Sequence, residues 1–334
     1  MLKVYYFLEL FYDLYREFRI QKKFNRRFLS PYLKQLEQKF EGNFSEALLK
    51  KIENYYCQFI PVLLCSRYKK LYGKRLSETE RTRAMWCGIL TPVFDDLIDA
   101  ENYSLDYLPD TIEAHQAFIP HHFLEKVAKE IQSHLLISIS NKKEYFEVIN
   151  KAYKSQIDSL RQKNKEIAYE DIYRITYEKG GAAFIVFRNL IDEPMSEDFE
   201  SAQYTIGFLF QISNDIFDIY KDVTDGICTL SNTVTKFSKL KKITEDLIYS
   251  QNDQIDALPF SSKRKLQFKL ATNIINARSL VGLDHLHSKF KTSYPLSFNF
   301  WESKARSETI IDMENPILFF KWLIYSWRLA KSRT

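Results

Sequence analysis

The chain of 334 residues is 45% hydrophobic and 15% aromatic, and it contains only 8 Gly and 9 Pro. This composition excludes a globally disordered protein and favours a sizeable core built from long, uninterrupted elements. The formal net charge of +5 is mild, and Lys and Arg are scattered among Asp and Glu. We therefore interpret the cations as a solvated surface and expect no nucleic-acid partner.

The cysteines and the N-terminal residues limit the cellular context. No paired metal-ligand spacing occurs among Cys57, Cys65, Cys87 and Cys228. We interpret them as buried or incidental thiols in a reducing compartment. The first residues show no basic region followed by an unbroken apolar run, and no stretch reaches the roughly 20 apolar residues that span a bilayer. We therefore expect a cytoplasmic protein without a transmembrane segment.

Apolar residues recur at helical spacing almost everywhere, for example within residues 48–64 and 206–219. Alternation of period two is rare, so strands are not favoured. Turn-forming residues occur near Gly73, Pro109, Pro194, Gly226, Pro259 and Pro295. They leave helices of about 15–25 residues. With no repeat, linker or composition shift, the sequence predicts an all-α protein with a single helical domain over residues 1–334.

An acidic cluster follows an apolar run at residues 94–101, which read Phe-Asp-Asp-Leu-Ile-Asp-Ala-Glu. On a helix, Asp95 and Asp99 are four residues apart and share a face, with Asp96 beside them. Like charges this close repel each other, and burying them is costly unless a cation is present. A hard divalent cation that also holds a phosphate-bearing substrate would relieve the repulsion. Taken alone, the cluster fits a solvated acidic face equally well.

Residues 173–183 contain Gly180 and Gly181 inside a helical pattern. Gly costs about 1 kcal/mol relative to Ala at such a position, so the pair predicts a helix break or a close approach. The alternative interpretation is that the glycines only allow tight helix packing, and that Arg174 lies on the surface.

A second polar stripe lies in an otherwise apolar and aromatic helix. Asn214, Asp218 and Asp222 are four residues apart and share one face over two turns. One amide oxygen and two carboxylates are unfavourable in a core, but they are good ligands for a divalent cation. Two oxygen-rich stripes on apolar helices predict facing helices that hold a metal cluster and a diphosphate between them.

The two stripes resemble known motifs. Residues 95–99 look like the aspartate-rich DDxxD motif of the class I isoprenoid synthase superfamily. Residues 214–222 resemble the second metal motif of terpene synthases, roughly NDxx(S/T)xx(K)E, with Asp218 in place of Ser or Thr and Asp222 in place of Glu. Both replacements keep an oxygen ligand, and the order and separation of the motifs also fit.

The second stripe, followed by Gly226, is also similar to the NxxxDxxxD helix of squalene and phytoene synthases. Those enzymes typically have an Arg before the middle Asp and an Arg-x-Tyr after the Gly. Here the corresponding positions are Phe217, Ile227 and Thr229. This difference disfavours head-to-head condensation. Chain-elongating synthases would have Asp at position 214.

The resemblance implies a single-domain helical bundle with a central active-site cavity, and three Mg²⁺ ions as cofactor. The implied metal ligands are Asp95, Asp96, Asp99, Asn214, Asp218 and Asp222. It further implies that Arg174 senses the diphosphate one to two turns before a helix kinked at Gly180 and Gly181, and that Lys221 contacts the diphosphate. A solvated Lys221 is the alternative.

The function implied is that of a Mg²⁺-dependent class I terpene synthase, which ionises an allylic prenyl diphosphate and cyclises or rearranges the carbocation. A prenyltransferase of the same superfamily, or a non-catalytic helical protein that binds prenyl diphosphates, is the alternative. The resemblance also allows a homodimer. The amphipathic residues 316–328 are expected to form a core helix, with peripheral membrane contact as the other interpretation.

Overall fold

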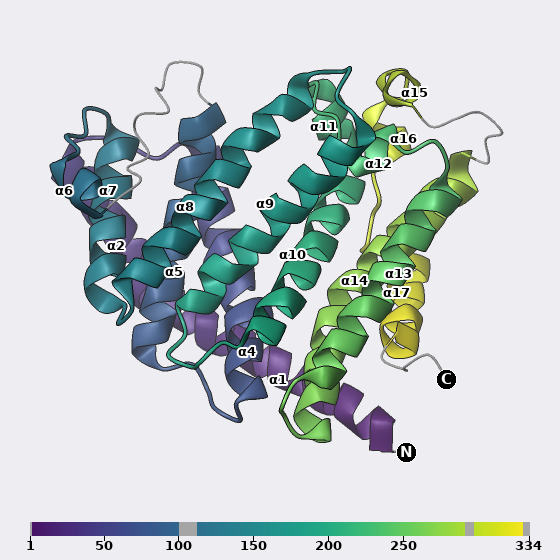
Figure 1. Ribbon diagram of the computed structural model, residues 1–334, viewed down its shortest axis with the longest axis horizontal. Helices are drawn as coiled ribbons and strands as arrows, with labels where there is room; N and C mark the ends of the chain where they lie inside the picture. Colours follow the sequence, from purple (N-terminus) through teal and green to yellow (C-terminus); the bar gives the residue numbers. More distant parts are fainter. Residues whose placement is uncertain (1, 100–111, 291–296, 330–334) are drawn as a thin grey trace. The chain divides into compact units, whose positions relative to one another are not determined.

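The computed structural model describes residues 2–99, 112–290 and 297–329, and in these ranges it contains helices and no strand (Figure 1). The predicted all-α class is confirmed. The chain divides into two compact units, Met1–Gln156 with Val186–Pro194, and Ile157–Ile185 with Met195–Thr334. Helices α8 (Lys142–Asp158) and α9 (Tyr169–Asn189) each contribute residues to both units. The expectation of a single domain stays a prediction.

The first unit is organised around α5 (Glu78–Asp99), which packs against α7 and η2. Most of its side chains between residues 83 and 97 are buried, among them Ala84, Cys87 and Leu97, as expected for a helix that is surrounded by others. The remaining helices are α1 (Leu2–Phe24), α2 (Ser30–Phe40), α3 (Glu46–Lys50), α4 (Ser66–Leu71), α6 (Ile112–Ala117), α7 (Phe123–Ser138) and most of α8. The π-helical segments are η1 (Asn25–Leu29), η2 (Lys51–Tyr56) and η3 (Pro61–Cys65).

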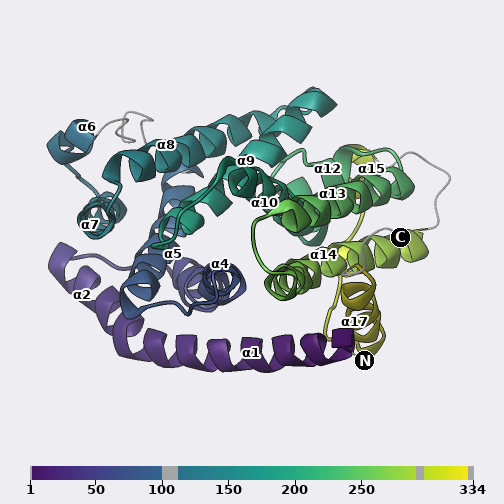
Figure 2. The same cartoon turned by 60° about the horizontal axis from the view of Figure 1, so that its bottom comes forward.

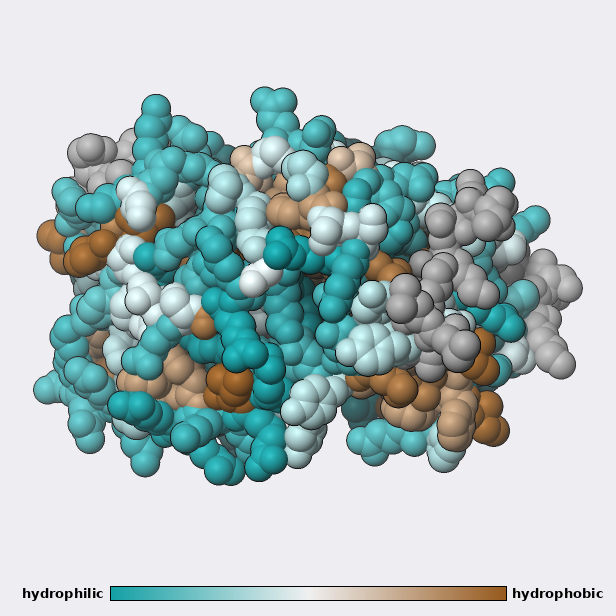
Figure 3. All heavy atoms as spheres, turned by 90° about the horizontal axis from the view of Figure 1, so that it is seen from below, coloured by the Kyte–Doolittle hydropathy of each residue, from teal (hydrophilic) through white to brown (hydrophobic). Residues whose placement is uncertain are grey.

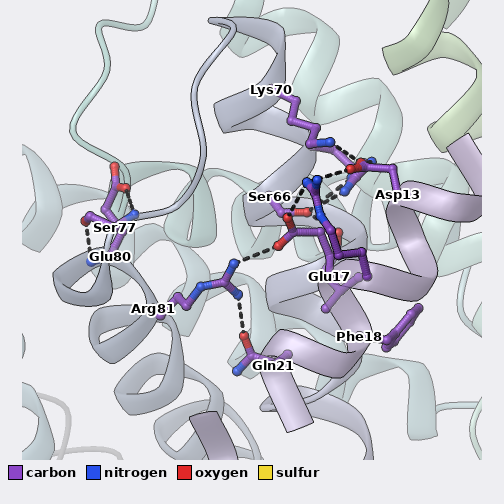
Figure 4. A network of polar contacts seen from close by, with 12 residues as sticks. Asp13, Glu17, Phe18, Gln21, Ser66, Lys70, Ser77, Glu80 and Arg81 are labelled. Carbon is purple, nitrogen blue, oxygen red and sulfur yellow. Dashed lines mark hydrogen bonds and ion pairs between the residues drawn. The ribbon is translucent and has the colours of Figure 1, made fainter. Parts of the chain in front are cut away.

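Figure 2 shows α1 as one long helix, in purple, and Figure 4 shows the polar contacts that hold its inner face. The Asp13 Oδ2 atom accepts a hydrogen bond from Arg67 Nη1 of α4 at 2.7 Å. The Glu17 Oε2 atom accepts one from Arg81 Nη2 of α5 at 2.6 Å, and Arg81 Nη1 donates to Gln21 Oε1 at 2.9 Å. All five side chains are buried. These paired charges therefore fix which face of α1 points inward.

The second unit is built on α10 (Glu197–Phe217), which packs against α13 (Phe237–Ala257) and α14 (Ser262–Phe290). The Ser196 side chain caps α10 by accepting a hydrogen bond from the Phe199 amide at 3.3 Å. The stripe formed by Ile206, Phe208, Leu209, Ile212 and Ile216 is buried, as its spacing predicts. The unit also contains η5 (Ser159–Lys163), most of α9, α11 (Ile219–Thr224), α12 (Leu230–Thr233), α15 (Phe298–Glu302), α16 (Arg306–Thr309) and α17 (Pro316–Leu329).

The described turns and the cysteines lie as the sequence predicts. Chain turns at Gly73 and Gly226 have positive φ angles of 76° and 71°, which favour glycine. Pro194 and Pro259 lie between helices, as expected. The turns expected near Pro109 and Pro295 lie outside the described residues. The cysteines are all buried and free, which confirms their interpretation as buried thiols.

The C-terminal amphipathic run forms α17, which packs on α14. Trp322 Nε1 donates to the Ile274 carbonyl at 2.7 Å, and the Tyr325 hydroxyl donates to Asp284 Oδ2 at 2.5 Å. The opposite face leaves Ile317 and Phe320 about two-thirds exposed, at 66% and 64%. The expectation of a core helix therefore holds for only one face of α17.

Seen from below, the molecule is mostly hydrophilic, with hydrophobic side chains gathered in separate patches (Figure 3). In the described ranges, no helix has the length and apolar character required to cross a membrane.

Replacing Glu17 with Gln tests the ion-pair network beneath α1. The substitution removes one charge and leaves Arg81 buried without its carboxylate, so we expect the free energy of unfolding to fall by about 3 kcal/mol. Urea denaturation followed by circular dichroism measures this change. The control is Lys50→Gln, which breaks the ion pair with Glu46 at a site where both side chains are more than two-thirds exposed, and it should cost less than about 0.5 kcal/mol. Equal losses in the two variants would contradict this account of α1.

Candidate functional site

The first acidic cluster lies in the last two turns of α5, in the first unit. Asp95 and Asp96 are half-buried and Asp99 is the last residue of the helix. The Asp99 side chain, like all of Glu101, lies outside the described residues. Carboxylates at the C-terminal end of a helix face the negative end of its macrodipole. At this position the negative charge of the cluster is disfavoured unless a cation or solvent compensates it.

Two side chains of η2 contact this cluster. The Tyr56 hydroxyl donates to Asp95 Oδ2 at 3.4 Å, and Lys51 Nζ forms an ion pair with Asp96 Oδ1 at 2.8 Å. Burial raises the pKa of Tyr56 well above its usual value, and the Asp95 charge raises it further. Tyr56 therefore remains a neutral donor. The Lys51–Asp96 pair is solvent-exposed, so it contributes little to stability.

The second stripe spans the end of α10 and the start of α11. The helix breaks at Asp218, which caps both elements with φ −99° and ψ 10°. The Asp218 amide still donates to the Asn214 carbonyl, and the Asp222 amide to the Asp218 carbonyl, each at 2.8 Å. The four-residue spacing predicted from the sequence therefore continues across the break. Asn214 is half-buried, Asp218 is exposed and Asp222 is buried.

Asp215 and Asp222 are two buried carboxylates of the second unit, and we call them the buried pair because the Asp215 charge acts on Asp222. Burial raises the pKa of Asp215 to about 7, and the Asp218 charge acts in the same direction. Burial also raises the pKa of Asp222 to about 8, and the Asp215 charge adds to this increase. Gln211 Nε2 donates to Asp215 Oδ1 at 2.8 Å. Asp215 was not among the site residues predicted from the sequence, because spacing alone does not show that its carboxyl group is buried.

Two cations near these carboxylates were also missed. The charge of Lys179 on α9 lowers the pKa of Asp215 and Asp222, and so opposes the increase that their burial causes. The Arg278 guanidinium on α14 lies 3.6 Å from the centroid of the Phe217 ring, and its charge lowers the pKa of Asp218. These side chains come from other helices, so spacing within residues 214–222 carried no signal for them.

The predicted cations are placed differently. Arg174 is exposed and pairs with Asp158 Oδ2 at 2.7 Å and Asp171 Oδ1 at 3.3 Å. The hydrogen bonds that Arg174 donates to these carboxylates raise its pKa. Lys221 is exposed and lies 3.7 Å from Asp225. Both cations therefore have carboxylate partners on the surface, as the alternative interpretation of Arg174 predicts. The charge of Lys221 also lowers the pKa of Asp218 and Asp222.

Gly180 and Gly181 lie where α9 approaches α10 most closely. A Cβ atom on Gly180 would lie 2.3 Å from the Gly207 carbonyl oxygen, and one on Gly181 would lie 2.1 Å from the Tyr204 ring. The predicted close approach is confirmed. The alternative, a break in the helix, does not occur, because α9 is helical without interruption from Tyr169 to Asn189. Since Lys179 precedes Gly180, the contact also brings its charge toward the carboxylates on α10.

The donor atoms of the second stripe suit a hard cation. Asn214, Asp215, Asp218 and Asp222 all offer oxygen, and the buried carboxylates would be stabilised by a positive charge. Among the residues described, no group of three or more His, Cys, Asp or Glu side chains is arranged to hold a metal ion. A divalent ion would therefore need further oxygen ligands, such as the Asn214 amide, water or a substrate phosphate.

No protein-family model matches the chain, and neither does any curated protein. The resemblance to isoprenoid synthases therefore depends on the two motifs and on the all-helical class. Asp95 and Asp96 belong to the first unit, and the residues from Asn214 to Asp222 belong to the second.

The buried pair predicts a pH-dependent stability in metal-free protein. A folded-state pKa above the unfolded value of about 3.9 favours the protonated form, so stability is highest below that value and is lost as pH rises through about 7 to 8. Between pH 5 and 7, the free energy of unfolding should fall more steeply than in Asp215→Asn, by up to about 1.4 kcal/mol per pH unit.

Urea denaturation with EDTA at several pH values measures this slope. Asp225→Asn, at the exposed end of the same segment, is the matched control and should follow the original chain. Parallel profiles for the original chain and Asp215→Asn would show that the Asp215 carboxyl is not perturbed.

Proposed function

We propose that this chain is a Mg²⁺-dependent enzyme of the class I terpene synthase type. It would bind an allylic prenyl diphosphate, ionise it, cyclise or rearrange the carbocation and release diphosphate. The observation that carries the proposal is the buried Asp215–Asp222 pair within an oxygen-rich stripe that resembles the second metal motif of these enzymes. A carboxylate pair at this depth would be stabilised by bound cations.

The proposed metal ligands are Asp95, Asp96 and Asp99 in one motif, and Asn214, Asp218 and Asp222 in the other. Mg²⁺ prefers octahedral oxygen sites and keeps several waters, which fits a few side-chain oxygens completed by phosphate. When bound, Mg²⁺ would neutralise charge on the departing diphosphate. Asp215, next to Asn214, would increase the negative potential that attracts the ions.

The cations of the second unit would help to bind and orient the diphosphate. Lys179, Lys221 and Arg278 all act electrostatically on carboxylates of the stripe, so all three are candidates. Arg174 would have to leave Asp158 and Asp171 to contact a phosphate. Positive groups fixed near the leaving diphosphate would stabilise the charge that develops during ionisation.

Aromatic side chains on α9 and α10 would protect the carbocation from water. The ring centroids of Tyr177 and Phe208 are 5.6 Å apart, and those of Phe184 and Phe210 are 5.2 Å apart. Aromatic faces stabilise cations by electrostatic attraction, and apolar walls exclude water. The proposal includes a helical bundle with a central cavity that holds the prenyl chain.

A prenyltransferase of the same superfamily is the second candidate. It is favoured by the carboxylate at Asp218, where terpene cyclases usually have Ser or Thr. The four-residue spacing from Asn214 to Asp222 persists through the helix break but does not distinguish the two classes. This spacing matches the helix of squalene and phytoene synthases as well as that of cyclases.

Incubation of the purified protein with geranyl, farnesyl or geranylgeranyl diphosphate and Mg²⁺ tests the proposal. Release of inorganic diphosphate with a hydrocarbon or alcohol from one substrate alone is expected for cyclisation. A requirement for a second prenyl unit would indicate the prenyltransferase. If no substrate releases diphosphate, the enzyme proposal fails, and measured binding without turnover would indicate a non-catalytic protein.

Single substitutions test the metal ligands. Asp95→Ala and Asn214→Ala should each lower turnover by at least about 100-fold, because a lost ligand removes several kcal/mol of transition-state stabilisation. Circular dichroism should show an unchanged helical content. Asp198→Asn, an exposed carboxylate in the first turn of α10, is the matched control and should keep full activity. Retained activity in both ligand variants would refute the metal assignment.

A further inference from the structure

The outward face of α1 carries a row of exposed apolar and aromatic side chains. Tyr5, Leu8, Tyr12 and Tyr15 are 60%, 64%, 68% and 61% exposed. Their spacing of three, four and three residues places them on one face of the helix. The row is a contiguous stripe, unlike the single exposed hydrophobic residues that are normal on protein surfaces.

The stripe is held outward by the opposite face. Asp13, Glu17 and Gln21 lie on the inner side, where they pair with α4 and α5 (Figure 4). At 100° per residue, these positions are on the opposite side of the helix from Leu8, Tyr12 and Tyr15. The buried charges therefore prevent α1 from rotating its aromatic stripe into the core.

The stripe continues directly into a basic cluster at the C-terminal end of α1 and in η1. This cluster consists of the exposed residues Arg19, Lys22, Lys23, Arg26 and Arg27. No acidic residue occurs between Glu17 and Glu37. In the part of the chain that the structure describes, none of the five cations forms an ion pair. Arg19 instead donates to the Tyr15 hydroxyl at 3.2 Å. The scattered distribution expected from the sequence does not hold in this region.

We propose that α1 and η1 dock on an anionic lipid bilayer, with the helix lying in the plane of the surface. The exposed Leu8 and the Tyr side chains would enter the headgroup region, and the five cations would contact anionic lipids. A helix with an apolar stripe beside a basic cluster is complementary to such a surface, which is apolar below a negative layer. At about 34 Å, α1 is long enough to form an extended contact.

The aliphatic members of this face favour a bilayer over a nucleic acid. Leu8 and Ile20 are 64% and 39% exposed, and aliphatic side chains neither stack on bases nor contact phosphates. The basic cluster disfavours pairing with a second copy, because two such clusters in a parallel pair would repel each other.

Vesicle co-sedimentation of the full chain tests the proposal. Binding should be strong with vesicles that contain about 30% phosphatidylserine, weak with pure phosphatidylcholine, and largely lost at about 0.5 M salt. Each Lys or Arg near the surface contributes roughly fivefold in affinity, so Lys22→Glu with Lys23→Glu should weaken binding by at least about 25-fold. Leu8→Ser with Tyr12→Ser should also weaken binding while the thermal melting curve stays unchanged, since both residues are exposed.

The matched control is Lys142→Glu with Lys143→Glu, at exposed positions on α8 that give the same change in net charge. It should retain most of the binding. Equal losses in the two charge variants would overturn the proposal, because net charge alone would then explain binding. Absence of binding to anionic vesicles would also overturn the proposal. If the chain instead bound RNA or associated with itself, and the α1 variants abolished that interaction, α1 would be a different docking surface and the proposal would be wrong.

Discussion

The electrostatic cost of burying Asp215 and Asp222 is the constraint on which the candidate site depends. Each carboxylate has lost much of its hydration, and the charge of Asp215 raises the energy of ionising Asp222. Without a cation, the pair can be accommodated only by holding protons near neutral pH. The same features that make the pair unfavourable in an empty protein would make it a strong attractor for Mg²⁺.

The packing of α9 on α10 determines which groups surround the pair. Gly180 and Gly207 let the two backbones approach so closely that any side chain at either position would collide. This contact brings Lys179 close enough to affect both carboxylates, and it brings aromatic rings of the two helices together, such as Tyr177 and Phe208 in edge-on contact. Charge near the end of α10 and apolar surface along it are the two properties that ionisation of a prenyl diphosphate requires.

Much of this arrangement was predictable because it depends on local periodicity. The helical class, the buried face of α10, the turns at Gly73 and Gly226 and the close approach at Gly180 all follow from patterns within one element. The missed features depend on contacts between elements. Asp215 is adjacent to Asn214 in sequence, yet its burial is decided by neighbouring helices. Lys179 and Arg278 act on the stripe from other helices, and Arg174 is held by Asp158, which the pattern around Arg174 could not reveal. The outward face of α1 was missed for the same reason, since ion pairs with α4 and α5 decide which side is exposed.

Titration calorimetry with inorganic diphosphate tests the central claim most directly, because it measures the proposed binding event without requiring turnover. At pH 8, diphosphate should bind only when Mg²⁺ is present, and Asp222→Asn should weaken this binding by at least about tenfold. Binding of equal strength without Mg²⁺, or binding that Asp222→Asn leaves unchanged, would contradict the account.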